Sequence, residues 1–145
     1  MNLAQCETLS ARLPSSPLSQ KGAYAVILNG DGQLLTVIAE NGRCYLPGGR
    51  IEAGETPRRA LLREIAEECG WSASILARMA DARQSIINQT IDLHASYWRA
   101  RLVRKLNSPA EHQMKWIAPD QAILELHRAA DRQAVQLAFA GQLEG

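Results

Sequence analysis

The sequence LPGGRIEAGETPRRALLREIAEECGW, residues 46–71, places five glutamates in one short segment. Three of them, Glu64, Glu67 and Glu68, fall within little more than one turn of a helix. Carboxylates about 5 Å apart repel by roughly 3 kcal/mol at an effective dielectric constant near 20, and exposed like-charge pairs on a helix cost a few tenths of a kcal/mol. A cluster that costs free energy in isolation needs a compensating partner.

The ends of this helix are marked by the residues around it. Thr56 supplies a hydroxyl N-cap, Pro57 suits the first helical position, and Gly70 suits the C-terminal end. The spacing therefore predicts a helix over residues 57–69. On a helical wheel the apolar residues fall together on one side and the three carboxylates on another; the apolar set is Leu61, Leu62, Ile65 and Cys69.

An exposed acidic face is the alternative interpretation of the glutamates, and three features count against it. The face concentrates acids, whereas an ordinary exposed face interleaves them with Lys and Arg, and its acids lie toward the C-terminal end, where the helix dipole disfavours negative charge. The pair Gly48 and Gly49 also allows the backbone to approach closely. Clustered carboxylates suit a hard cation such as Mg²⁺, so the sequence predicts a metal site.

The spacing of the segment resembles the Nudix box. Gly49, five residues, Glu55, seven residues, and then REIAEECG from Arg63 to Gly70 match that signature at all seven fixed positions. Trp71 stands where the family usually has Ile, Leu or Val, and as a large apolar residue we expect it to fill the same packing role.

The resemblance implies an α/β (α+β) fold, the Nudix α/β/α sandwich with a mixed β-sheet. It implies Mg²⁺, with Mn²⁺ as a substitute, held by the Gly48 carbonyl, Glu64, Glu67 and Glu68. Glu64 also helps to activate water in some members. Gly49, Glu55, Arg63 and Gly70 would support the motif structurally, with an ion pair between Glu55 and Arg63.

Outside the motif, candidate residues have two interpretations each. Glu111, in SPAEHQMKW, is a further catalytic or metal-binding glutamate by resemblance, or a solvated loop residue. Trp116 resembles a common family tryptophan, with core packing favoured over base stacking. Ordinary surface or core roles are favoured over phosphate or base contacts for Arg43, Arg83 and Tyr24, and His94 is not expected to be catalytic.

The remaining chain is divided by turn signals. Residues 1–20, with Pro14 and Pro17, predict a loosely ordered or edge-strand lead-in to one Nudix domain over residues 21–145. Residues 23–28 and 33–39 flank NGDG and predict a hairpin. Residues 44–49 predict a short strand ended by Pro47 and the two glycines. Strands are expected over 72–79 and 91–103, and helices over 118–127 and 129–141.

Composition excludes several classes of function. With 145 residues and a net charge of +1, the chain lacks the basic surface typical of proteins that bind nucleic-acid polymers. Three cysteines at irregular spacing favour neither a disulfide framework nor a zinc site. With no signal-peptide pattern or membrane-spanning run, we expect a cytoplasmic monomer or homodimer that contacts no membrane.

The resemblance predicts hydrolysis of a nucleoside diphosphate linked to another moiety. A nucleoside triphosphate, including oxidised forms, is the favoured substrate because the chain is short. ADP-ribose, dinucleoside polyphosphates and nucleotide sugars are alternatives. A nucleotide-binding regulatory module without turnover is the competing class, although such modules usually lose a box glutamate.

Overall fold

The computed structural model describes residues 18–86 and 91–140. Its elements, in chain order, are β1 (Leu18–Ile27), β2 (Leu34–Ile38), β3 (Cys44–Tyr45), β4 (Gly48–Arg50), α1 (Pro57–Cys69), β5 (Trp71–Ile86), β6 (Ile91–Lys105), β7 (Gln113–Ile117), α2 (Pro119–Glu125) and α3 (Ala129–Ala138). Residues 18–20 of the predicted lead-in belong to β1, and residues 1–17 lie outside the described residues. The limits of the predicted domain stay predictions.

The strands form two sheets. The larger has the order β4-β1-β6-β5, and β1 and β6 run parallel while the other neighbours run antiparallel. The smaller sheet has the order β3-β2-β7 and is antiparallel. The expected mixed sheet is therefore present, accompanied by a second one.

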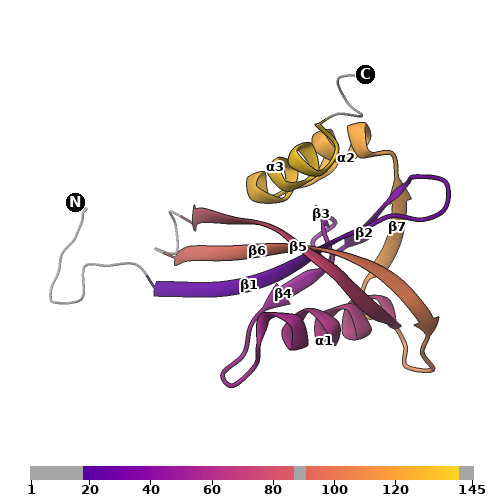
Figure 1. Ribbon diagram of the computed structural model, residues 1–145, viewed down its shortest axis with the longest axis horizontal. Helices are drawn as coiled ribbons and strands as arrows, with labels where there is room; N and C mark the ends of the chain where they lie inside the picture. Colours follow the sequence, from indigo (N-terminus) through magenta and orange to yellow (C-terminus); the bar gives the residue numbers. More distant parts are fainter. Residues whose placement is uncertain (1–17, 87–90, 141–145) are drawn as a thin grey trace, which may run out of the picture.

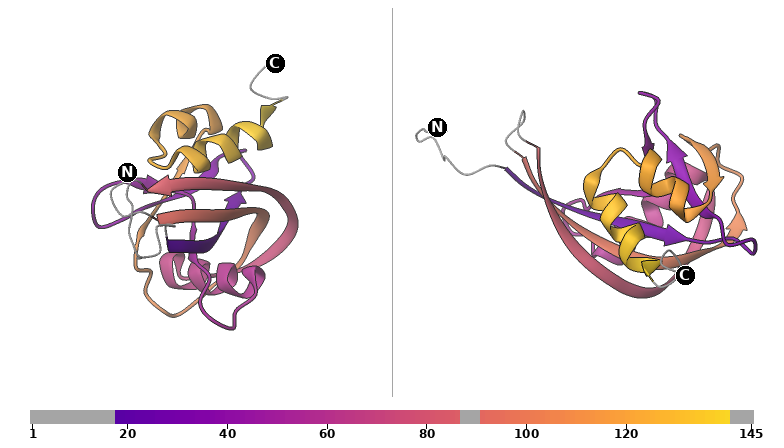
Figure 2. Two further views of the ribbon diagram at one scale, coloured as in Figure 1. Left: turned by 90° about the vertical axis from the view of Figure 1, so that its left-hand side faces the viewer. Right: turned by 90° about the horizontal axis from the view of Figure 1, so that it is seen from above.

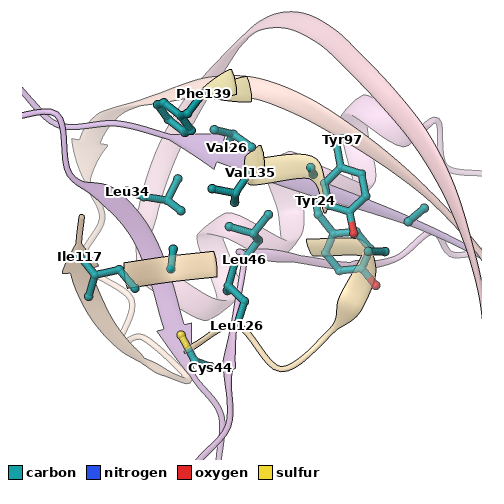
Figure 3. Packing of buried hydrophobic residues seen from close by; sticks show 14 of the residues in the cluster. Tyr24, Val26, Leu34, Cys44, Leu46, Tyr97, Ile117, Leu126, Val135 and Phe139 are labelled. Carbon is teal, nitrogen blue, oxygen red and sulfur yellow. The ribbon is translucent and has the colours of Figure 1, made fainter. Parts of the chain in front are cut away.

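Helices cover both sides of the strands, with α1 on one side and α2 and α3 on the other (Figures 1 and 2). Strand β1 shows why, because its side chains alternate between two apolar clusters. Ala25 and Ile27 pack with Leu61 of α1, whereas Tyr24 and Val26 belong to the cluster beneath α2 and α3 (Figure 3). The predicted α/β/α sandwich is confirmed.

Two strand predictions need correction. The runs around NGDG do not form a hairpin ladder: β1 and β2 lie in different sheets, and one bridge, Leu28 to Leu34, joins the runs. Along its length β2 pairs with β7, about 80 residues later in the chain, a strand that local patterns did not indicate. Gly48 and Gly49 do not end a strand; they begin β4, which pairs with β1.

Helix α1 begins and ends where predicted. The Thr56 side chain accepts a hydrogen bond from the N–H of Arg59, and Gly70 closes the helix in the left-handed region at φ 71°. The helix is rotated relative to the predicted wheel, since Leu62 is 38% exposed while Ala60 is fully buried. The buried arc thus includes the flank that carries Glu64 and Glu68, which face protein rather than open solvent. Among the described residues, none of the helices is long and apolar enough to cross a membrane.

Candidate active site

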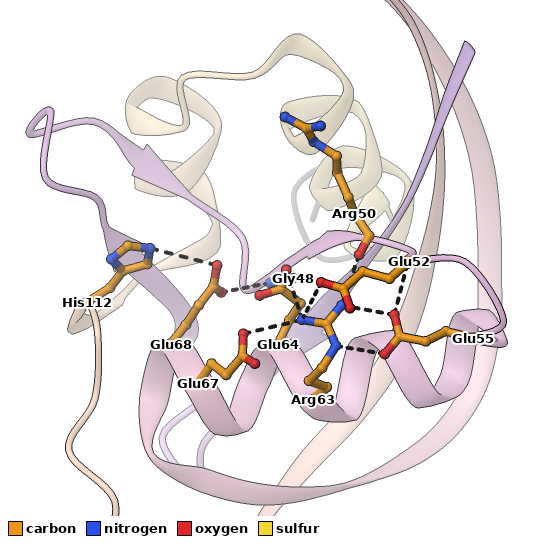
Figure 4. A network of polar contacts seen from close by, with 9 residues as sticks. All are labelled: Gly48, Arg50, Glu52, Glu55, Arg63, Glu64, Glu67, Glu68 and His112. Carbon is orange, nitrogen blue, oxygen red and sulfur yellow. Dashed lines mark hydrogen bonds and ion pairs between the residues drawn. The ribbon is translucent and has the colours of Figure 1, made fainter.

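The two glycines of β4 bring its backbone against α1. Gly48 has φ 140°, and a Cβ there would lie 2.2 Å from the carbonyl oxygen of Ala23. A Cβ on Gly49 would lie 1.9 Å from Oε2 of Glu64, well inside any permitted contact. Glycine at position 48 therefore lets β4 lie against β1, and glycine at position 49 lets it lie directly beside the Glu64 carboxylate of α1 (Figure 4).

Glu64 and Glu68 line one cavity of about 600 Å³ together with Gly48, Gly49 and other residues. Their side chains are only 17% and 12% exposed. Oε1 of Glu68 accepts a hydrogen bond from the N–H of Gly48 at 3.0 Å, which fixes this carboxylate against β4. Helix α1 thus places two carboxylates, which can donate oxygen ligands to a metal ion, at one cavity.

Burial makes both carboxylates hard to ionise without a cation. For Glu64, burial and then the charges of Glu67 and Glu111 raise the pKa to about 7, although Arg63 opposes this. For Glu68, burial and then Glu64 and Glu111 raise the pKa to about 8, although the hydrogen bond from Gly48 opposes this. The site has a surplus of negative charge that a bound cation would relieve.

Arg63 joins the helix to the loop before it. Its Nε donates to Oε2 of Glu55 at 2.7 Å and its Nη2 to Oε1 of the same carboxylate at 2.9 Å. Nη2 also donates to the carbonyl oxygen of Arg50 in β4 at 3.1 Å. The guanidinium lowers the pKa of Glu55 to about 2, with help from its backbone hydrogen bond with Glu52. The expected ion pair between Glu55 and Arg63 is therefore present, and it is bidentate.

Glu67 does not join the other two carboxylates in the cavity. Its Oε1 lies 3.3 Å from Nη1 of Arg63, and its side chain is 43% exposed. Accordingly, no three His, Cys, Asp or Glu side chains in the described ranges converge closely enough to hold a metal ion as they stand. The donor set still fits a hard divalent cation, because two partly buried carboxylates face the cavity and Glu67 lies between them on the same helix. The ligand roles of Gly48, Glu64, Glu67 and Glu68 stay predictions.

The loop before β7 closes the C-terminal end of α1. The N–H groups of Glu111 and His112 donate to the carbonyl oxygens of Glu67 and Glu68 at 2.9 and 3.1 Å. This satisfies helix carbonyls that would otherwise lack partners. The Glu111 side chain is exposed, and Nε2 of His112 lies 3.8 Å from Oε2 of Glu68. The structure brings Glu111 to the site by its backbone and its charge; its catalytic role stays a prediction.

Arg128 is a further group at the cavity that local sequence patterns did not indicate. Arg128, in the turn between α2 and α3, lines the cavity beside Glu68, and its Nη1 lies 3.2 Å from Oδ1 of Asp131. Asp131 is fully buried and also accepts from Tyr97. These residues are distant in sequence from the motif, and only the packing of α3 on the sheet brings them to it.

The remaining candidate residues take different places in the fold. Trp116 packs against the cluster shared with α1, as favoured, and Tyr24 is buried yet lines the cavity. Arg83 pairs with Asp92, next to His94, and Arg43 lies 3.2 Å from His127.

The family model described as NUDIX domain matches residues 18–138. That span covers most of the chain and includes both sheets, all three helices and the cavity. The chain belongs to the Nudix family, and the family assignment made from the motif is confirmed.

Individual relatives agree with this assignment. The chain is 30% identical over 105 residues to CTP pyrophosphohydrolase of Escherichia coli (strain K12), which covers 68% of this chain and 76% of that protein. It is 38% identical over 60 residues to Putative 8-oxo-dGTP diphosphatase of Bacillus subtilis (strain 168), covering 41% of this chain and 40% of that protein. The solution structure of the E. coli ORF135 protein superposes with a TM-score of 0.72 at 24% identity, over 92% of this chain and 97% of that one.

Proposed function

We propose that the protein is a Mg²⁺-dependent pyrophosphohydrolase that cleaves a nucleoside diphosphate linked to another moiety. The observation that carries this proposal is the pair of partly buried carboxylates, Glu64 and Glu68, facing one cavity beside the glycine strand β4. Ionising both carboxyls without a cation would cost free energy, so their presence at one cavity favours a cation as partner. The favoured substrate is a nucleoside triphosphate, including oxidised forms.

Different residues of the site would have different roles in the reaction. Glu64, Glu67 and Glu68 would hold the cation, with the Gly48 carbonyl as a further donor. A bound Mg²⁺ neutralises phosphate oxygens and lowers the pKa of a water molecule. Phosphoryl transfer requires mainly positioning and charge stabilisation, so a protein nucleophile is not needed. The Arg63–Glu55 pair holds the helix and the preceding loop in register, and Gly49 lets β4 lie beside the Glu64 carboxylate.

The names of the relatives favour triphosphates. The B. subtilis relative is named a putative 8-oxo-dGTP diphosphatase and the E. coli relative a CTP pyrophosphohydrolase. These names support the chemistry and a nucleotide substrate, and they differ in the base. ADP-ribose, dinucleoside polyphosphates and nucleotide sugars remain the alternative substrates.

The test is a substrate panel containing dNTPs, oxidised dNTPs and the three alternative classes, assayed with Mg²⁺, with Mn²⁺ and with EDTA. Phosphorus NMR should show release of pyrophosphate or a nucleoside monophosphate, and EDTA should abolish it. Glu68→Gln should lose orders of magnitude in rate, while Leu124→Ala, an exposed substitution on α2, serves as the control. Tight binding without turnover in either metal would instead identify a nucleotide-binding module, and the enzyme proposal would be wrong.

A further inference from the structure

A second, smaller cavity adjoins the first. It has a volume of about 190 Å³, and it shares Tyr24, Gly48, Glu68 and Arg128 with the larger one. Its remaining lining is mainly apolar or aromatic, namely Val37, Ala39, Tyr45 and Leu46, with His112 beside them. The larger cavity is therefore the acidic compartment and the smaller one an apolar compartment suited to a planar ring.

Arg128 stands at the boundary of the two compartments and is held by aromatic rings. Its guanidinium carbon lies 4.5 Å from the ring centre of Tyr24 and 5.1 Å from that of Tyr45. The Arg128 side chain is 19% exposed. Stacking on two rings restricts the plane of the guanidinium, so its N–H groups point in defined directions.

Asp131 anchors the guanidinium from the other side. It is fully buried, and its two oxygens accept hydrogen bonds from the hydroxyl of Tyr97 at 2.6 Å and from the N–H of Leu46 at 3.1 Å. Nη1 of Arg128 donates to Asp131 at 3.2 Å. Both contacts with Asp131 use Nη1, and within the described residues Nε and Nη2 donate to no protein acceptor. Because Arg128 lines both cavities, these donors can serve a ligand there.

The charge of the pair decides what kind of ligand group fits. Asp131 neutralises Arg128, so the pair exerts a weaker field on a phosphate than a free cation would. Its N–H donors, in contrast, keep their direction and can serve a neutral acceptor. A planar guanidinium matches two adjacent acceptors on a base edge, as guanine O6 and N7 provide, whereas adenine places a donor beside N7.

We propose that Arg128 is a specificity-determining residue that reads the nucleobase and selects a purine with two adjacent acceptors, the guanine O6/N7 edge. This inference rests on the proposed hydrolysis of nucleotides and adds the base to it. The base would lie in the apolar compartment, with its phosphates directed toward Glu64 and Glu68.

The test compares dGTP with dATP, two purines of matched size. In the unaltered protein, kcat/KM should be about 10- to 100-fold higher for dGTP. Arg128→Lys keeps the positive charge next to Asp131 but loses the planar pair of N–H donors. The ratio of kcat/KM for dGTP to that for dATP should then fall to within about threefold of unity. Arg132→Lys is the matched control, because Arg132 donates to the carbonyls of Leu126 and His127 and lines neither cavity. Its ratio should not change.

A second measurement needs no variant. In the unaltered protein, 7-deaza-dGTP, which lacks the N7 acceptor, should lose most of the advantage of dGTP, while dITP, which keeps O6 and N7, should retain it. The dissociation constants of dGTP and dATP should also be compared by calorimetry in EDTA.

These outcomes separate the two proposals. Hydrolysis with no preference for dGTP, or with a preference that Arg128→Lys leaves intact, overturns the role of Arg128 alone. An equal loss for dGTP and dATP in Arg128→Lys also overturns it, because it indicates a phosphate contact. Absence of hydrolysis overturns the proposed function, and tighter binding of dGTP that depends on Arg128 would then still support the base contact.

Discussion

Replacing Glu68 with Gln tests whether burial suppresses the ionisation of this carboxyl when no cation is bound. The pKa of Glu68 is raised from 4.5 to about 8, and the side chain is only 12% exposed. A carboxyl whose folded pKa is raised contributes stability that is complete below pH 4.5 and is lost as the pH rises through about 8. At pH 7 the unfolded chain would carry this charge and the folded protein would largely not, a difference on the order of 3 kcal/mol.

The metal-free protein should therefore lose about 2–3 kcal/mol of its free energy of unfolding between pH 5 and pH 7 through Glu68. In Glu68→Gln this contribution should disappear, and the amide oxygen can still accept the hydrogen bond from Gly48. The assay is urea denaturation in EDTA at several pH values in that range. The window lies above the lowered pKa of Glu55, so that group does not contribute.

Glu67→Gln is the matched control, because it makes the same chemical change one residue before Glu68, at a side chain that is 43% exposed. Its stability should follow the pH dependence of the unaltered protein within about 1 kcal/mol. Parallel pH curves for the unaltered protein and Glu68→Gln would refute the reasoning, since they would mean that Glu68 titrates alike in the folded and unfolded states.

Gly49→Ala should lower kcat at least about tenfold with little change in melting temperature. The new methyl group would displace the movable side chain of Glu64 rather than backbone, so the fold should hold while the carboxylate moves. Steady-state kinetics and thermal melts followed by circular dichroism test this. Arg63→Ala should lower both the melting temperature and activity, because the Glu55 carboxylate loses its two-pronged partner, and loss of substrate affinity alone would assign Arg63 to the substrate instead. Mg²⁺ should raise the melting temperature of the unaltered protein progressively with concentration, and Glu68→Gln should reduce this shift in a thermal-shift titration.

Local chemistry determined the central helix. Thr56, Pro57 and Gly70 specify its ends by hydrogen bonding and backbone preference within a few residues, so its 13-residue span could be predicted. The spacing from Gly49 to Gly70 likewise identified the family, because the residues of the motif contact one another, as Arg63 does Glu55.

Long-range packing decided how that helix is oriented and what surrounds it. Leu62 was predicted to face the core but is exposed, because contact with the sheet selects the buried arc and the wheel alone cannot. Glu67 belongs to the acidic cluster in sequence, yet it turns to Arg63 instead of the cavity.

Strand pairing likewise depends on contacts between distant parts of the chain. The NGDG turn was recognised, but β2 pairs with β7 rather than forming a ladder with β1, since burial of both faces selects partners far apart in the chain. The sequence by itself determined the motif and its helix. Tertiary structure alone decided that Arg128, Asp131 and Tyr97 meet beside Glu68, because a site built from distant segments exists only once their burial brings them together.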